Sequence, residues 1–151
     1  EAALVLSSPG SARSLLESGI RKSFAKVLGF PATINVTPSA TFVPSTARQD
    51  DYVNNLVLAK YDATTTNDEK LEIIMKEYYI ALWGNGIDAF NNYRRTGKPG
   101  NMQLPIVSAP GAFTSSMFYP SVHVNRNNTA AQKTGVDKHV FWDTNPAGFN
   151  K

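Results

Sequence analysis

The sequence contains no cysteine. This absence excludes disulfides, thiolate metal sites, thiol nucleophiles and lipid attachment to cysteine within the chain, and it leaves the redox compartment open. No apolar run approaches the roughly 18–20 residues that a membrane-spanning helix needs. The first residues, EAALVLSSPG, lack the basic region and the longer apolar stretch of a signal peptide.

Charge is also scarce. The formal net charge of +3 is mild, and the basic residues are spread out, with Arg94-Arg95 as the only adjacent arginines, so we expect no nucleic-acid partner. Residues 99–125 carry no charge at all but hold prolines and aromatic residues. A loop of this length is uncommon unless it has a role, so we expect it to lie over the helices or over another chain.

Motifs for metal, phosphate or nucleophilic chemistry are missing as well. Gly84-Asn85-Gly86 lacks the third glycine of a dinucleotide fingerprint and follows no strand. His123 and His139 are far apart and have no zinc-site spacing. Asp137 and Asp143 flank His139 and form a loose cluster at best, so we expect neither a metal nor a cofactor.

What is present is a helical pattern. The 151 residues, 42% hydrophobic and 11% aromatic, suit one packed domain. We interpret residues 1–151 as a single portion, helical over 1–97 and loop-rich over 98–151. The first six residues resemble the end of a helix whose beginning is missing, which suggests a fragment of a longer protein.

Apolar periodicity predicts the individual helices. Ser11 or Ser14 caps a helix that Gly29 and Pro31 end. A second helix spans 46–61, and Thr66 begins a third, with Glu69 completing a capping box. The expected inward faces are Leu16, Ile20, Phe24 and Leu28; Val53, Leu56, Val57 and Tyr61, with Tyr52 as a further candidate; and Leu71, Ile74, Met75, Tyr78 and Leu82.

Two glycines interrupt the third helix. Gly84 and Gly86 each weaken a helix by about 1 kcal/mol relative to alanine. Periodicity resumes with Ile87 and Phe90, so we expect two helical pieces, continuous or bent near Asn85. Near the C-terminus, residues 139–143 form a candidate strand or hydrophobic anchor.

A catalytic carboxylate pair is the first functional hypothesis. Glu77 and Asp88 would lie roughly 16 Å apart along a continuous helix, at 1.5 Å per residue. Glycosidase carboxylates lie about 5–9.5 Å apart. We therefore expect no catalytic residue here and interpret both acids as structural partners of basic groups such as Arg94 or Arg95.

Carbohydrate binding is the second hypothesis, because aromatic faces and planar amides are suited to sugar rings and hydroxyls. Trp142 and Tyr119 lie in loop-rich sequence, where exposure is expected, and are the candidate ligand-binding residues. Trp83 falls in a helical stripe, and we expect it in the core.

The most distinctive block is EYYIALWGNGIDAFNNYRRTGKP, residues 77–99. It resembles the signature of SusD/RagB-like proteins of the starch-binding, outer-membrane-associated branch, which run from an aromatic-Ile-Ala-Leu helix through acid-Ala-aromatic to Arg-Arg-Thr-Gly-x-Pro. The matching parts here are 79–82, 88–90 and 94–99. Gly19-Ile20 and Ser23-Phe24 match an earlier helix pair of the family.

The end of the chain carries the resemblance further. Tyr119-Pro120 with Asn125 and Asn128, and Phe141-Trp142-Asp143, resemble the family's closing elements. Two positions depart from the pattern: His123 stands where an acid is expected, and Ser115-Ser116 where basic residues are usual. The resemblance covers nearly the whole chain but only the C-terminal third of a full-length member.

The resemblance implies a mostly α-helical fold of tetratricopeptide-like α-α superhelix type with a long loop-rich C-terminal region. It implies a non-catalytic glycan-binding lipoprotein of the Bacteroidetes outer membrane, exposed on the cell surface, with its signal peptide and lipid anchor in the missing N-terminal part. The implied partners are an oligosaccharide or polysaccharide and a SusC-like TonB-dependent transporter. The alternative is a helical scaffold or lid that binds peptides or protein partners for the same type of transporter.

Within this family signature, Asp88, Arg94, Arg95 and Gly97 are expected to be structural. Cations at a helix end favour the negative end of the helix dipole, and Gly97 suits a helix terminus. We expect these residues to clamp the helix end to the loop that follows.

Overall fold

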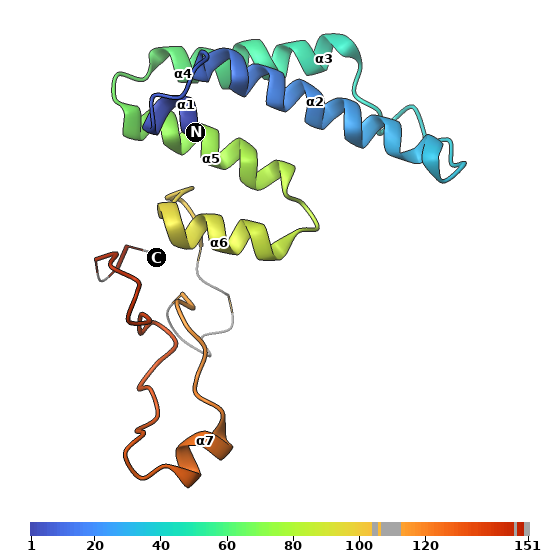
Figure 1. Ribbon diagram of the computed structural model, residues 1–151. Coiled ribbons are helices and arrows are strands. Elements are labelled where there is room, and N and C mark those ends of the chain that lie inside the picture. The colour runs from blue at the N-terminus through green and yellow to red at the C-terminus, as the bar shows by residue number, and fades with distance from the viewer. Residues whose placement is uncertain (104–105, 107–112, 147, 150–151) are drawn as a thin grey trace. The chain divides into compact units, whose positions relative to one another are not determined.

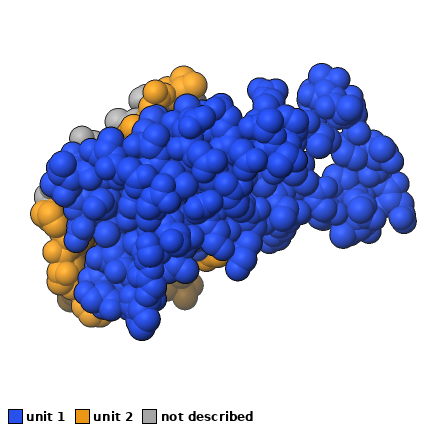
Figure 2. Space-filling view, turned by 90° about the horizontal axis from the view of Figure 1, so that it is seen from above, with its two compact units in different colours: residues 1–86 blue, residues 87–151 orange. Residues whose placement is uncertain are grey.

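The computed structural model describes residues 1–103, 106, 113–146 and 148–149. These residues form helices and irregular segments without a β-strand, so the prediction of a mostly α-helical fold is confirmed (Figure 1). The contacts divide the chain into two compact units, residues 1–86 and 87–151, which are coloured separately in Figure 2. The change from helical to loop-rich composition falls later than this boundary, near residue 97. The assignment of residues 1–151 to a single portion stays a prediction.

Unit 1 is a helical layer. Its elements are α1 (Ala2–Val5), α2 (Ala12–Thr33), α3 (Thr46–Asp51), the π-helix η1 (Tyr52–Leu58), α4 (Ala59–Ala63) and α5 (Asn67–Ala81). α3, η1 and α4 run on as one rod beside α2, and α5 contacts α1, α2 and α4 (Figure 1). Salt bridges tie α2 to this rod at Arg13–Asp62, 2.7 Å, and Arg21–Asp50, 2.6 Å.

The core of unit 1 lies where α2, η1 and α5 meet. Val53, Met75 and Leu58 are the most deeply buried, and Leu16, Ile20, Val57, Tyr61 and Ile74 complete the cluster. Phe24 and Leu71 pack against it, with the Phe24 ring edge-on to Tyr52 at 5.9 Å. Most of the expected inward faces are therefore confirmed.

Side-chain caps begin the helices as the sequence indicates. Of the two candidates, Ser11 caps α2 by accepting from the Ser14 amide. Thr66 and Glu69 form the complete capping box of α5, in which each side chain accepts from the other residue's backbone N–H. Together these caps satisfy donors that the first helical turn leaves without an intrahelical partner.

The prediction that Gly29 and Pro31 end the helix now labelled α2 is wrong. The helix continues through Gly29 and Pro31 to Thr33. Proline removes one hydrogen bond to the carbonyl four residues earlier. Val27 and Phe30 are more than half exposed, so this last turn lies at the surface, where water can satisfy the carbonyl that Pro31 leaves unpaired.

The π-helix changes which residue of the second helix is buried. Leu56, expected inside, is 50% exposed, while Leu58 is 2% exposed. A π-helix bonds residue i to i+5 and so places one more residue in its turn than an α-helix. The inward stripe therefore shifts from Leu56 to Leu58 between Val53 and Tyr61.

The two helical pieces expected around Asn85 are confirmed, because α5 ends at Ala81 and α6 (Gly86–Thr96) begins five residues later. Gly84 lies between them with φ +88°. Trp83 is therefore beyond the helix and is 96% exposed, so its placement in the core is wrong. Tyr78, also expected inside, is 45% exposed.

Unit 2 holds most of α6, the short α7 (Ser121–Arg126) and long irregular segments. Three aromatic rings pack together in this unit: the buried Tyr93 ring meets the Phe113 ring edge-on at 4.6 Å, and Phe113 stacks at 5.7 Å on Phe90, which is 37% exposed. Val136 is also buried, and its carbonyl accepts from the amides of Ser115 and Ser116. Part of the uncharged 99–125 loop, at 104–105 and 107–112, lies outside the described residues.

Candidate functional site

The end of α6 is joined to the C-terminal segment of the same unit. The Arg94 guanidinium lies 3.6 Å from the Asp143 carboxylate, whose side chain is 8% exposed. His139 Nδ1 lies 3.7 Å from the same carboxylate, and the Asn145 amide donates to it at 3.2 Å. Arg94 also lies over the Phe90 ring at 5.6 Å. A nearly buried acid is thus surrounded by two basic side chains and a backbone donor.

Two further contacts close this junction. The Asn145 side-chain amide donates to the Arg94 carbonyl, one of those that the helix end leaves unpaired, at 3.2 Å. Gly97 has φ +66° and donates its N–H to the Tyr93 carbonyl at 2.7 Å, as a glycine that ends a helix does. A Cβ at Gly97 would lie 3.1 Å from the Phe149 carbonyl oxygen. The junction therefore accepts only glycine at this position without strain.

The other two residues of the expected structural motif lie on the same helix. Asp88 is in the first turn of α6, where a carboxylate favours the helix dipole. Arg95 donates to the Asn92 side-chain oxygen at 2.8 Å. Arg94 reaches the C-terminal segment, where its partner is Asp143.

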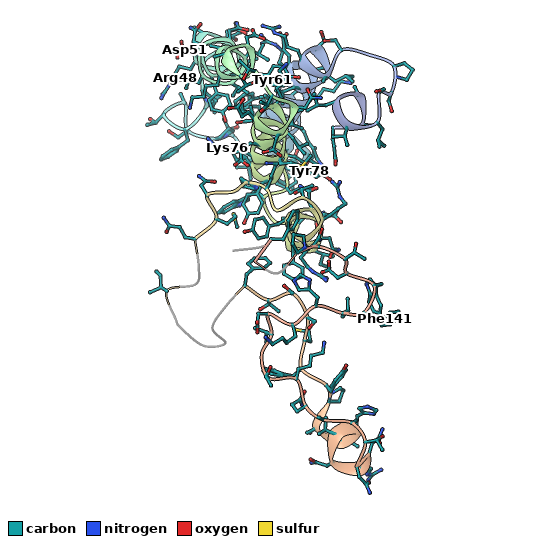
Figure 3. The ribbon with its side chains drawn as sticks, turned by 90° about the vertical axis from the view of Figure 1, so that its left-hand side faces the viewer. Arg48, Asp51, Tyr61, Lys76, Tyr78 and Phe141 are labelled. Atoms are coloured by element: carbon teal, nitrogen blue, oxygen red, sulfur yellow. The ribbon has the colours of Figure 1, made fainter. Side chains whose placement is uncertain are left out.

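Residues 140–143 form a turn that displays two aromatic rings, so of the two alternatives expected at 139–143, a strand or a hydrophobic anchor, the strand is wrong. The Asp143 N–H donates to the Val140 carbonyl at 2.9 Å. At the tip, Phe141 is 94% exposed and Trp142 is 67% exposed, and their rings meet edge-on at 4.5 Å. Figure 3 shows Phe141 on the outside of its turn. Because Asp143 is held by Arg94, the turn has a fixed base beneath its exposed rings.

Tyr119 is held by a different device. The Gln132 side chain accepts from the Tyr119 N–H at 3.0 Å and donates to the Tyr119 carbonyl at 2.9 Å. The Tyr119 ring stays 44% exposed. Lys133 Nζ lies 4.9 Å from its centre, and the His123 ring lies at 5.9 Å. Both candidate ligand-binding residues, Trp142 and Tyr119, thus present exposed rings on fixed backbones.

Unit 1 carries an apolar groove of about 800 Å³ along α2 and α5. Its walls include Leu15, Phe24, Val27, Ile80 and Trp83, and Tyr78, labelled on α5 in Figure 3, also lines it. The sequence held a signal for this groove, because α2 and α5 carry more apolar residues than their buried faces need, among them Leu15, Val27 and Ile80.

A single buried acid lines that groove. Glu77 is 8% exposed and accepts from the Tyr52 hydroxyl at 2.9 Å. Burial raises the pKa of the Glu77 carboxyl, and the Tyr52 hydrogen bond opposes that rise. Burial, together with the Glu77 carboxylate, raises the pKa of Tyr52 to about 12. The partner of Glu77 is therefore a tyrosine, not the arginine that the sequence suggested.

The remaining candidate chemistry is not assembled among the described residues. No group of three or more histidine and acidic side chains there could hold a metal ion. His139 shares Asp143 with Arg94, while Asp137 pairs with Lys138 at 3.0 Å. His123 lies beside Tyr119 instead.

Comparison with known proteins decides the family. The family model SusD-like, described as Susd and RagB outer membrane lipoprotein, matches residues 1–140. The chain belongs to the SusD-like family. The resemblance drawn from residues 77–99 is therefore confirmed, and membership supports a location at the outer membrane. Searches of curated proteins and of solved structures gave no match. Among the described residues, no helix of this SusD-like chain is long and apolar enough to cross a membrane.

Sequence reasoning missed the residues that hold the exposed rings. Gln132 and Lys133 are thirteen or more positions from Tyr119 and belong to no motif, so their contacts depend on the path of an irregular segment. The Arg94–Asp143 contact was easier to predict, because both residues belong to elements that resemble the family pattern.

Proposed function

We propose that this SusD-like chain is a non-catalytic glycan-binding component of an outer-membrane nutrient-uptake system. It would be lipid-anchored on the cell surface and would pass an oligosaccharide or polysaccharide to a TonB-dependent transporter. Family membership supports this role. The structural observation that carries it is the display of aromatic rings on fixed frames, since sugars pack their C–H faces on such rings.

Trp142 is the first proposed contact. Its indole is exposed at the tip of a turn whose base, Asp143, is fixed by Arg94 and by the Asn145 amide. A ring held in place before binding loses little conformational freedom when a ligand arrives. Tyr119 is the second proposed contact, because its backbone N–H donates to the Gln132 side chain and its carbonyl accepts from it, which fixes the backbone in the same way.

Isothermal titration of the intact protein against a panel of oligosaccharides tests this function. Replacing Trp142 or Tyr119 by alanine should weaken binding about 2- to 13-fold, as expected for losing an aromatic contact of about 0.5–1.5 kcal/mol. The matched control is Phe42→Ala, which removes a ring that is 84% exposed in unit 1. Absence of binding to every glycan would sink the glycan assignment.

A turnover assay on any glycan that binds tests the non-catalytic assignment. We expect no release of reducing ends, because the buried acids described are engaged in structural contacts: Glu77 with Tyr52, and Asp143 with Arg94. Release of reducing ends that depends on Glu77 or Asp143 would show instead that the protein is a hydrolase.

The groove of unit 1 favours the alternative function, binding of a peptide or protein segment. Its apolar walls suit an amphipathic segment, and the buried Glu77 carboxylate suits one basic side chain within that apolar face. The test is titration with amphipathic peptides that differ only in one lysine or norleucine. Tighter binding of the lysine peptide, with this preference lost in the Glu77→Gln variant, supports the alternative. Equal affinity for both peptides contradicts it.

A further inference from the structure

We propose that the surface around Tyr119 binds an acidic sugar through its uronate carboxylate, an inference that rests on the proposed glycan-binding function. The proposed site consists of Tyr119, His123, Arg126 and Lys133, here called the Tyr119 cluster. The sequence has no acidic residue between Asp88 and Asp137. The cluster, at residues 119–133, lies within this acid-free stretch.

Lys133 is held in place by neutral partners. Its Nζ donates to the Ser116 hydroxyl at 2.7 Å and lies 4.9 Å from the centre of the Tyr119 ring. Neither contact offsets its charge with a carboxylate, and no salt bridge is found for Lys133 among the described residues. A positioned ammonium attracts an anionic ligand.

His123 and Arg126 extend the cluster along α7. They are three positions apart and so share one face of the helix. The His123 ring lies 5.9 Å from the Tyr119 ring. Both side chains are exposed, and neither forms a salt bridge with a described residue. By contrast, Arg13, Arg21 and Arg94 all pair with aspartates. Arg126 is thus available for the two-pronged hydrogen bonding that guanidinium groups make to carboxylates.

One side chain fixes both parts of the cluster. The Gln132 amide holds the Tyr119 backbone at two points, and its oxygen also accepts from the Lys133 N–H at 3.0 Å. The Gln132 side chain therefore holds the backbone of Tyr119 and the backbone N–H of Lys133 before a ligand binds, while Ser116 holds the ammonium. Such preorganisation lowers the entropic cost of binding. A sugar can pack on the exposed part of the Tyr119 ring while its carboxylate meets Lys133 and Arg126.

Titration of the intact protein with two matched ligands tests this inference. The probes are oligogalacturonate and its fully methyl-esterified form, which share one sugar backbone and differ in charge. We expect at least tenfold tighter binding of the acid at low salt, and we expect this preference to shrink as salt rises, because salt screens exposed charges.

Two double variants locate the site. Lys133→Ala with Arg126→Ala should abolish the preference for the acid. Lys22→Ala with Lys26→Ala, which removes the same charge from α2 in unit 1, should leave it unchanged; circular dichroism checks that both variants are folded. Equal loss in both variants would mean general charge attraction and would overturn the site.

The outcomes also separate this inference from the proposed function. Equal affinity for the acid and its ester, or binding of neutral glycans alone, overturns the acidic-sugar inference and leaves the glycan-binding function standing. No binding of any glycan, charged or neutral, overturns both.

Discussion

The contact between Arg94 and Asp143 yields the sharpest stability prediction. The perturbation is Arg94→Met, which keeps much of the packed stem and removes the charge. Breaking a buried ion pair costs about 3–5 kcal/mol, whereas an exposed pair contributes about 0–1 kcal/mol. The Asp143 side chain is 8% exposed, but Arg94 is 26% exposed and the pair is separated by 3.6 Å. We therefore expect an intermediate loss of about 2 kcal/mol.

The matched control is Lys138→Met. Lys138 lies closer to its partner, 3.0 Å from Asp137, but the two side chains are 54% and 44% exposed. Solvent screens this pair, so its loss should cost less than about 0.5 kcal/mol. If distance rather than burial governed the energy, the order of the two variants would be reversed.

Urea unfolding followed by tryptophan emission measures both losses. Trp83→Phe removes the exposed indole of unit 1 and leaves Trp142 as the reporter of the turn beside Asp143. A double-mutant cycle with Asp143→Asn should give a coupling energy of about 1–2 kcal/mol, as neighbouring residues do. A coupling below about 0.5 kcal/mol, or equal losses for Arg94→Met and Lys138→Met, would refute the reasoning.

Three further outcomes follow from single positions. Gly97→Ala should lower the free energy of unfolding by about 1–3 kcal/mol, and by more than Gly84→Ala does, as measured by urea unfolding. Both glycines have positive φ, but only at Gly97 would the added Cβ also meet Phe149. Burial raises the pKa of the Glu77 carboxyl in the folded protein. The free energy of unfolding should therefore fall as pH rises from the pKa of an unfolded glutamate, about 4.3, through the raised pKa of the folded state. Urea unfolding at several pH values should show this fall, and Glu77→Gln should flatten it. Thr66→Ala should cost about 1 kcal/mol by removing the capping box, and no change in melting temperature would contradict that assignment.

Local sequence rules predicted the helices of unit 1 well where the physics is local. The capping box at Thr66 and Glu69 and the buried faces around Leu16 and Ile74 follow from spacing alone. The rules failed where hydrogen bonding departs from the α-helical pattern. The π-helix exchanged Leu56 for Leu58, and the early end of α5 left Trp83 in solvent.

The site was harder to predict than the fold. Exposure of Trp142 and Tyr119 could be expected from their loop-rich surroundings. The contacts that hold their backbones could not be predicted. Gln132 reaches Tyr119, and Asp143 reaches Arg94, from irregular segments that have no repeating pattern. Contacts of this kind depend on the whole path of the chain rather than on the spacing of residues along it.

Titration of the Trp142 indole tests the central claim most directly. With Trp83 replaced by phenylalanine, Trp142 is the only indole in the 151-residue sequence. The account predicts a saturable change in its emission when the bound glycan is added, and loss of binding strength when it is replaced by alanine. Tight glycan binding with unchanged Trp142 emission and an unaffected alanine variant would contradict it.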